Sequence, residues 1–152
     1  LEPALELTVR SIAAALDADV AAVGVLFAGP VGDLRVVALY PSAGGATSGD
    51  DPTLPLSDYP ILDDAAATGS YATTRVTTEG TSGLEGVYRE LGYEATGPLM
   101  VQPLSHGDKT FGLILVGNPN SGREWTRDEE ETLQATALAL SPAIAGRHSR
   151  RG

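Results

Sequence analysis

The side chains that most often carry catalysis are scarce in this sequence. It has no cysteine, which excludes disulfides, thiolate metal sites, thiol nucleophiles and thioether-linked chromophores. Its two histidines, His106 and His148, stand far apart along the chain. Because no nucleophile–base pair and no metal-ligand cluster is evident, we expect no enzymatic activity, no metal site and no cofactor.

Two pairs of adjacent carboxylates, Asp50-Asp51 and Asp63-Asp64, are of the type that binds hard metals or transfers protons. Neighbouring residues on a helix point in different directions, and no third ligand accompanies either pair. The glycines of Gly44-Gly45 and of residues 80–83 lack the spacing of a phosphate-binding loop. We therefore interpret all of these residues as solvated loop and helix positions.

Tyrosines and two polar side chains are better candidates for contact with a small molecule. A tyrosine joins a broad apolar face to one hydroxyl, which suits both a protein core and a binding pocket. Gln102 lies inside an apolar run, where a buried amide needs a ligand, a water or a backbone group as partner; on an outward face it would simply be solvated. Arg75 could hold a carboxylate or phosphate, or pair with a surface carboxylate. The candidate ligand-binding residues are Tyr59, Tyr71, Arg75, Tyr88 and Gln102, with Tyr93 as a further tyrosine.

The elements that must position these side chains begin with a helix and a β-hairpin. Residues 1–17 carry an apolar stripe at helical spacing, formed by Leu5, Val9, Ile12 and Leu16. Residues 20–28 form an almost continuous apolar run, and residues 34–40 form a second run after a short turn. Such a pair predicts two buried antiparallel strands.

The middle of the chain is more polar. Residues 42–55 predict a loop, and residues 58–67 predict a short helix ended by Gly69. Residues 71–76 indicate a short strand, and residues 84–91 a further short helix.

The last third predicts a second antiparallel strand pair, residues 99–104 and 110–116, followed by a helix. Thr126 and Glu129 have the spacing of a capping box, which places the start of this helix. Pro142 predicts that the helix kinks or ends near Leu140.

Both strand pairs look buried on two faces, and such a sheet needs a layer on each side. The terminal helices can cover one face, and the segment from about residue 42 to residue 95 the other. The sequence thus predicts an α+β fold. It is a three-layer α/β/α sandwich with a central, mainly antiparallel sheet of five or six strands and the N- and C-terminal helices on one face.

This order of motifs resembles the GAF domain family of sensory modules in signalling proteins. The family pattern has a strand ending in a Val-Pro-Leu-like triplet, a polar turn, a Gly-hydrophobic-Leu-hydrophobic strand and a helix opened by Phe-Thr-x-x-Asp/Glu. The chain matches it with Gln102-Pro103-Leu104, with residues 112–115, and with Trp125-Thr126 followed by Asp128 and Glu129. Residues 56–69 are similar to the family's middle helix with its closing glycine. The resemblance covers nearly the whole chain and implies a pocket between the sheet and the middle layer, lined by the candidate residues above.

The best-known ligand chemistries of the family lack their residues here. The Asn-Lys-x-Phe-Asp-Glu set of cyclic-nucleotide binders is not found, and the cysteines of bilin-binding and methionine-sulfoxide-reducing relatives are missing.

Composition limits the partners and the location that we expect. The net charge of −10 argues against nucleic acid and anionic membranes, because both need a positive patch. The apolar runs are far shorter than the roughly 20 residues of a membrane span, and no secretion signal is visible. The chain begins with Leu1 and not Met, so we expect it to be a piece of a longer, cytoplasmic protein. Residues 1–147 should form a single domain and residues 148–152 a linker or tail.

Two hypotheses about function follow from the resemblance. The first is a regulatory or sensory module of a multidomain signal-transduction protein. In it a small molecule binds between the sheet and the middle helices, the terminal helices form a parallel homodimer, and an output domain lies downstream in the parent chain. The alternative is a degenerate GAF-like domain that acts only as a structural or dimerisation unit, with no ligand.

Overall fold

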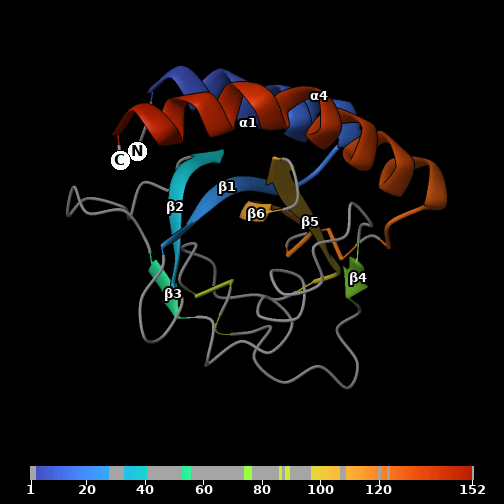
Figure 1. The fold of residues 1–152 in the computed structure, drawn as a ribbon. Coiled ribbons are helices and arrows are strands. Elements are labelled where there is room, and N and C mark those ends of the chain that lie inside the picture. Colours follow the sequence, from blue (N-terminus) through green and yellow to red (C-terminus); the bar gives the residue numbers. More distant parts are fainter. Residues whose placement is uncertain are drawn as a thin grey trace.

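Two terminal helices lie side by side across one face of a single sheet (Figure 1). The computed structural model describes residues 3–27, 33–40, 53–55, 74–76, 86, 88–89, 97–106, 109–119, 121–122 and 124–151. Helix α1 spans Pro3–Leu16 and helix α4 spans Arg127–Arg151. The helices run in opposite directions, so the two chain ends lie close together at one side of the molecule.

The sheet has six strands in the order β3-β2-β1-β6-β5-β4, and all neighbouring pairs are antiparallel. The strands are β1 Val20–Phe27, β2 Asp33–Tyr40, β3 Thr53–Pro55, β4 Thr74–Val76, β5 Leu99–His106 and β6 Lys109–Gly117. Both predicted hairpins are confirmed, and they join along β1 and β6 at the centre of the sheet. The predicted fold class, with its mainly antiparallel sheet and its terminal helices on one face, is confirmed.

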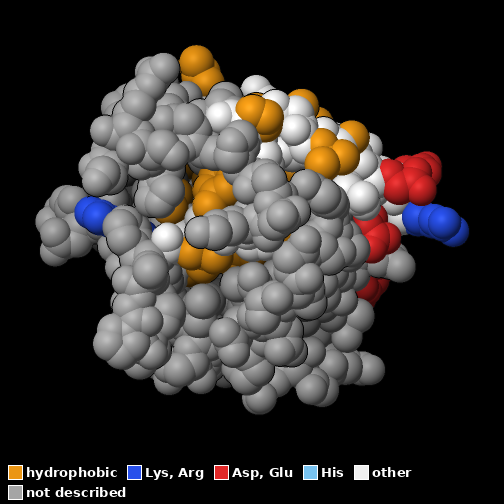
Figure 2. Space-filling model, viewed as in Figure 1, with side chains coloured by type: hydrophobic (Ala, Val, Ile, Leu, Met, Phe, Trp, Pro, Cys, Tyr) orange, Lys and Arg blue, Asp and Glu red, His pale blue; other side chains and the backbone are white. Residues whose placement is uncertain are grey.

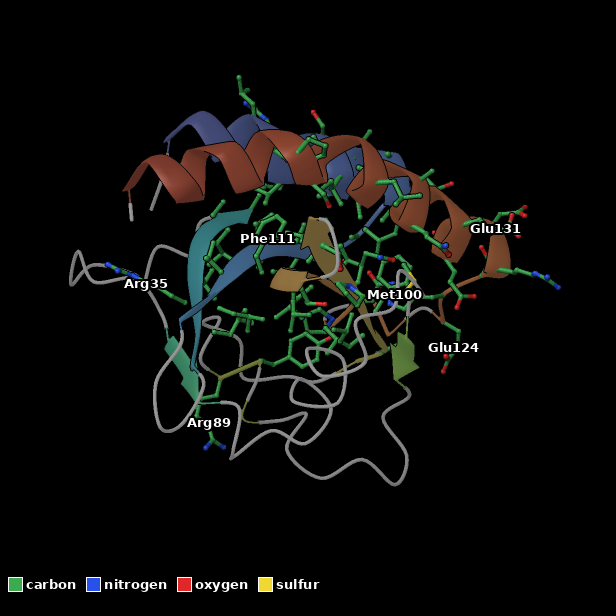
Figure 3. The ribbon with its side chains drawn as sticks, in the orientation of Figure 1. Arg35, Arg89, Met100, Phe111, Glu124 and Glu131 are labelled. Atoms are coloured by element: carbon green, nitrogen blue, oxygen red, sulfur yellow. The ribbon has the colours of Figure 1, made fainter. Side chains whose placement is uncertain are left out.

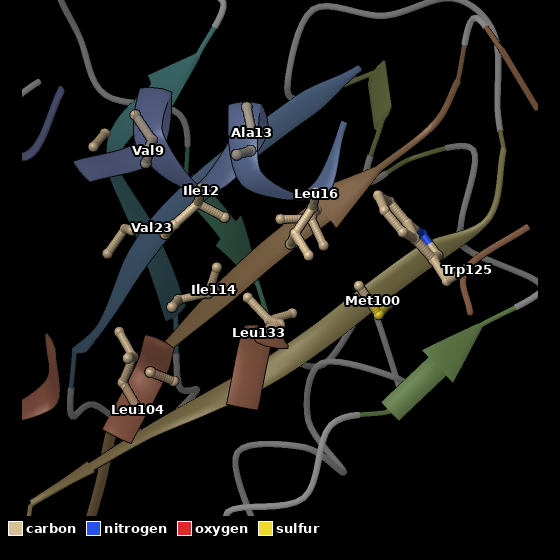
Figure 4. Close-up of a cluster of buried hydrophobic side chains, with 14 of the residues drawn as sticks. Val9, Ile12, Ala13, Leu16, Val23, Met100, Leu104, Ile114, Trp125 and Leu133 are labelled. Carbon is tan, nitrogen blue, oxygen red and sulfur yellow. The ribbon is translucent and has the colours of Figure 1, made fainter. Parts of the chain in front are cut away.

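The terminal helices cover what we call the helix face of the sheet, and the hydrophobic core there is continuous (Figure 4). The apolar stripe of α1 supplies Val9, Ile12 and Leu16, and α4 supplies Leu133 and Ala137. The sheet contributes side chains of alternate residues, as strand geometry requires, from β1, β5 and β6: Ala21, Val23, Val25, Met100, Leu104, Ile114 and Val116. Burial of each larger apolar side chain stabilises the fold by about 1.5–3 kcal/mol.

Local signals set the ends of both helices. Helix α1 ends at Leu16, and the next residue, Asp17, has a left-handed φ of 52°. The Ala18 N–H donates to the Ala13 carbonyl at 2.9 Å. The capping box of α4 is confirmed. The Thr126 N–H donates to Glu129 Oε1 at 2.9 Å, and the Glu129 N–H donates to Thr126 Oγ1 at 3.2 Å.

Of the two outcomes expected at Pro142, an end of the helix is wrong, because α4 continues through it to Arg151, and a kink stays a prediction. A proline inside a helix removes one backbone donor, and α4 accommodates this loss without ending. The neighbouring Ser141 hydroxyl donates to the Ala137 carbonyl at 2.7 Å. The helix therefore includes most of the residues that we expected to form a linker or tail.

The middle segment is described only in part. Strand β3 lies within the predicted loop of residues 42–55 and pairs Leu54 with Leu34 at an edge of the sheet. The predicted strand at residues 71–76 is represented by β4, and the predicted helix at residues 84–91 by the helical residues Gly86, Tyr88 and Arg89. The predicted helix at residues 58–67 lies outside the described residues. None of the helices that the structure describes is long and apolar enough to cross a membrane.

Candidate functional site

The face of the sheet opposite the terminal helices is the place where we expect a ligand, and we call it the Tyr88 face. Residues paired across neighbouring strands point to the same side of a sheet. The pairs Ala22↔Leu39, Gly24↔Val36 and Leu99↔Gly117 therefore share this face. Its buried members outside the helix-face core are Val20, Ala22, Leu34, Val36, Leu39, Tyr88, Leu99, Val101, Leu113 and Leu115. Apart from the Tyr88 hydroxyl, this set offers only apolar side chains.

Part of this face is filled by the protein itself. A Cβ placed on Gly24 would lie 2.6–3.0 Å from three side-chain carbons of Leu34, so the leucine covers the glycine closely. The covered area lies toward the β1–β2 side of the sheet. The rest of the face is formed mainly by β5 and β6, through Leu99, Val101, Leu113 and Leu115, which are also buried.

Tyr88 is fully buried on this face, and its hydroxyl bonds to the backbone. The oxygen lies 3.0 Å from the carbonyl oxygens of both Gly97 and Pro98. Burial raises the pKa of this hydroxyl far above its usual value. Two smaller effects act on the same pKa: a backbone hydrogen bond from Asn118 lowers it, and the negative charge of Asp19 raises it. The hydroxyl thus stays protonated and serves as a donor. Its geometry is that of a packed core tyrosine, and contact of its ring with a ligand stays a prediction.

Gln102 lies on the other side of the sheet. It pairs with Ile114, and its neighbours two residues away, Met100 and Leu104, belong with Ile114 to the helix-face core. The side chain is fully buried, and its amide nitrogen donates to the Pro103 carbonyl at 3.1 Å. A ligand on the Tyr88 face would not reach this side chain. The buried amide therefore has a backbone partner, one of the alternatives that the sequence left open.

The other candidates are placed less fully. Arg75 lies in edge strand β4 at the register position opposite Met100. Tyr59, Tyr71 and Tyr93 lie outside the described residues. Within the described ranges, no group of three or more His, Asp and Glu could hold a metal ion.

A second polar feature was not predicted. The carbonyl oxygen of Pro98 accepts hydrogen bonds from the Tyr88 hydroxyl, from Trp125 Nε1 and from the Asn118 N–H, each at 3.0 Å. Trp125 belongs to the helix-face core, whereas Tyr88 lies on the opposite face. The only sequence signals were the lone tryptophan before the capping box and the Asn118-Pro119 turn. Neither signal identifies a shared carbonyl.

Two terminal helices on one face of an antiparallel sheet are also the arrangement of a known family of domains. A sequence profile of the GAF domain family matches residues 1–144. The chain belongs to the GAF domain family. Among curated proteins, none matches this GAF domain in sequence.

Solved structures share the fold at low sequence identity. The GAF domain of a phosphoenolpyruvate-protein phosphotransferase (ptsP) from Coxiella burnetii has a TM-score of 0.73 and 16% identity, with 97% of this chain and 83% of that chain covered. The blue-light absorbing form of the Thermosynechococcus elongatus PixJ GAF domain has a TM-score of 0.67 and 20% identity, with 97% and 88% covered. Residues 122 to 287 of a methyl-accepting chemotaxis protein have a TM-score of 0.68 and 17% identity, with 93% and 86% covered. Domains with this fold thus occur in signalling proteins.

Proposed function

We propose that this GAF domain is a regulatory or sensory module of a multidomain, cytoplasmic signal-transduction protein, and that a small molecule binds between its sheet and its middle segment. The observation that carries the proposal is the apolar character of the Tyr88 face, to which Val101, Leu113 and Leu115 belong. Such a wall suits a ligand with a broad apolar or aromatic face whose polar groups are turned away from the sheet. The occurrence of the fold in signalling proteins supports a regulatory role.

The domain's own contribution is then binding, and an output domain elsewhere in the parent chain responds. The proposal includes no reaction catalysed by this domain and no nucleic-acid or membrane partner. The net charge of −10 supports the exclusion of polyanionic partners, because a surface rich in carboxylates repels phosphates.

Native mass spectrometry of the gently purified domain tests the ligand. Ala21 and Ala22 are fully buried neighbours on β1 that point to opposite faces, so Ala22→Leu and Ala21→Leu form a matched pair. Each adds three carbons to a packed site and should cost about 1–3 kcal/mol. We expect an adduct mass on the parent and on Ala21→Leu, and its loss from Ala22→Leu. Loss of the adduct from both variants, or from neither, would contradict a site on the Tyr88 face.

The structural alternative is favoured by two contacts. Leu34 fills the space over Gly24, and the Tyr88 hydroxyl is engaged with backbone carbonyls. In this alternative the domain is a spacer or dimerisation unit whose pocket is filled by its own side chains. Clean apo masses of the parent in the same experiment would support it.

A homodimer through the terminal helices completes the proposal. Leu7 on α1 and Leu138 on α4 are 67% and 49% exposed. Figure 2 shows apolar side chains on the outer surface of these helices and acidic ones gathered where α4 begins. Burial of such side chains against a second copy would contribute to association.

The substitutions Leu138→Gln and Glu131→Gln test this dimer, since both residues lie on the exposed part of α4. We expect Leu138→Gln to weaken the dimer about tenfold, about 1.4 kcal/mol, and Glu131→Gln to change it little. Sedimentation equilibrium measures both. A parent domain that stays monomeric at high concentration would count against the dimer.

A further inference from the structure

A junction at one end of the sheet joins its two faces. It is centred on the carbonyl oxygen of Pro98, directly before β5. The Tyr88 hydroxyl reaches this oxygen from one face and the Trp125 indole N–H from the other, both at 3.0 Å, and the Asn118 N–H is a third donor at 3.0 Å. A carbonyl oxygen has two lone pairs. Three donors therefore compete for an acceptor that makes two strong bonds.

The Tyr88 hydroxyl has an alternative. It carries one proton and lies 3.0 Å from the carbonyl oxygens of both Gly97 and Pro98. When the proton points to Gly97, the Pro98 oxygen is left to Trp125 and Asn118. When it points to Pro98, each of the three bonds weakens. The orientation of one buried hydroxyl thus determines how firmly the indole of Trp125 is held.

Close packing restricts the ways in which Tyr88 can move. A Cβ on Gly117 would lie 2.8 Å from two carbons of the Tyr88 ring and closer still to its hydroxyl oxygen. A Cβ on Gly97 would overlap the Asn118 carbonyl. The ring therefore already touches the β6 backbone, and a displacement must carry the hydroxyl away from it.

Trp125 links this junction to α4. It is 4% exposed and lies beside Met100 at one end of the helix-face core (Figure 4). It directly precedes Thr126, the first residue of the capping box. A change in the position of the indole is thus passed along one peptide unit to the first turn of α4.

The end of α1 is tied to the same strand ends. The Asp19 N–H lies 3.1 Å from both the Gly117 carbonyl oxygen and Asn118 Oδ1, and Asp19 Oδ2 accepts from the Ser121 N–H at 2.6 Å. Asn118 thus contacts the connection after α1 through its side chain and Pro98 through its backbone. Both terminal helices are anchored at this junction.

The geometry points to this junction as the device that passes a change in the middle segment to the terminal helices. Displacement of Tyr88 leaves the Pro98 carbonyl to Trp125 and Asn118, strengthens the indole hydrogen bond and moves the first turn of α4. The inference rests on the proposed regulatory function and adds the route by which a signal crosses the sheet. Figure 3 shows the neighbouring Arg89 on the side of the sheet away from α1 and α4, where a bound molecule would act.

The substitution Tyr88→Phe tests the coupling, because it removes only the hydroxyl and so imitates displacement. Trp125 is the only tryptophan of the chain, so its indole N–H gives one NMR signal in the 152-residue protein. We expect this signal to move downfield and its hydrogen exchange to slow severalfold, and the amide signals of residues 127–130 to shift. The control Ser141→Ala removes another buried hydroxyl donor, bonded to Ala137, and should leave the indole signal unmoved.

Each outcome decides the matter. An indole signal that is unmoved or moves upfield in Tyr88→Phe, or that responds equally to Ser141→Ala, overturns the junction. If Tyr88→Phe does not fold, Trp125→Phe serves instead: a downfield shift of the Asn118 amide supports the shared carbonyl, and an unmoved amide refutes it. The ligand proposal can fail while the junction proposal stands. This is the case if native mass spectrometry finds no adduct but the indole signal still shifts in Tyr88→Phe. A ligand adduct with an unmoved indole signal refutes the junction alone.

Discussion

The substitution Gly117→Ala probes the tightest contact between the sheet and the middle segment. The new methyl carbon would lie 2.8 Å from two ring carbons of Tyr88, where ordinary contact begins at 3.4 Å, and nearer still to the hydroxyl oxygen. Because the ring is fully buried, it cannot rotate into solvent. Relief of the overlap must pull the hydroxyl from the carbonyls of Gly97 and Pro98, both now at 3.0 Å.

The expected cost follows from these two effects. Loss of a buried hydroxyl bond costs about 1–3 kcal/mol, and overpacking adds about 1–3 kcal/mol. We expect Gly117→Ala to lower the free energy of unfolding by about 2–6 kcal/mol. At roughly 2–4 °C per kcal/mol in a domain of this size, Tm should fall by roughly 4–24 °C. Urea denaturation followed by Trp125 fluorescence and by far-ultraviolet circular dichroism measures the first, and calorimetry the second.

A double-mutant cycle with Tyr88→Phe shows whether the hydroxyl is responsible. Removal of the oxygen takes away the closest contact, so the double variant should be more stable than the sum of the two single changes predicts, by about 1 kcal/mol or more. Additive effects, or a Gly117→Ala domain within about 0.5 kcal/mol of the parent, would refute the packing argument.

Two further predictions concern the capping box and the tyrosine. Thr126→Ala should lower the free energy of unfolding by about 1 kcal/mol, because the Glu129 N–H loses its 3.2 Å acceptor; urea denaturation measures this, and an unchanged midpoint would contradict the cap. The pKa of Tyr88 is raised by folding, so its contribution to stability is fully present below the unfolded value of about 10 and is lost as the pH rises beyond that value. The parent should therefore lose stability more steeply above pH 10 than Tyr88→Phe does, and parallel stability curves would show that Tyr88 ionises as freely in the fold as out of it.

The sequence predicts the sheet and helices well wherever the signal is local. The apolar run of residues 20–28 and the Thr126–Glu129 spacing each specify an element within a few residues of themselves. Strand β3 was missed because it has only three residues and ends in Pro55, which is tolerated at a sheet edge but reads as a loop. At Pro142 the sequence allowed a kink or an end, and the end was wrong because a single missing backbone donor does not stop α4 before Arg151.

The candidate site was less accessible to sequence reasoning. Alternate residues of a strand point to the same face, so the sequence places Gln102 on one face with Met100 and Leu104. Only the packed structure shows that this face lies beneath α1 and α4. The meeting of Tyr88 and Trp125 at Pro98 has no sequence signature, because the acceptor is a backbone carbonyl that every residue possesses. Such contacts depend on three-dimensional placement of segments that no local pattern connects.

The central pairing of β1 with β6 has a consequence for how the domain is made. Asp19 and Asn118, which bond at the end of this pair, are separated by 99 residues, so the two central strands meet only after most of the chain has left the ribosome. Until then the β1–β2 hairpin lacks both its inner neighbour and the cover of α4, and its apolar edge is open to wrong partners. Contacts of such long range make folding slow, on the order of milliseconds to seconds. We therefore expect nascent chains that stop before residue 117 to depend on chaperones and to be degraded rather than to persist as a half-domain.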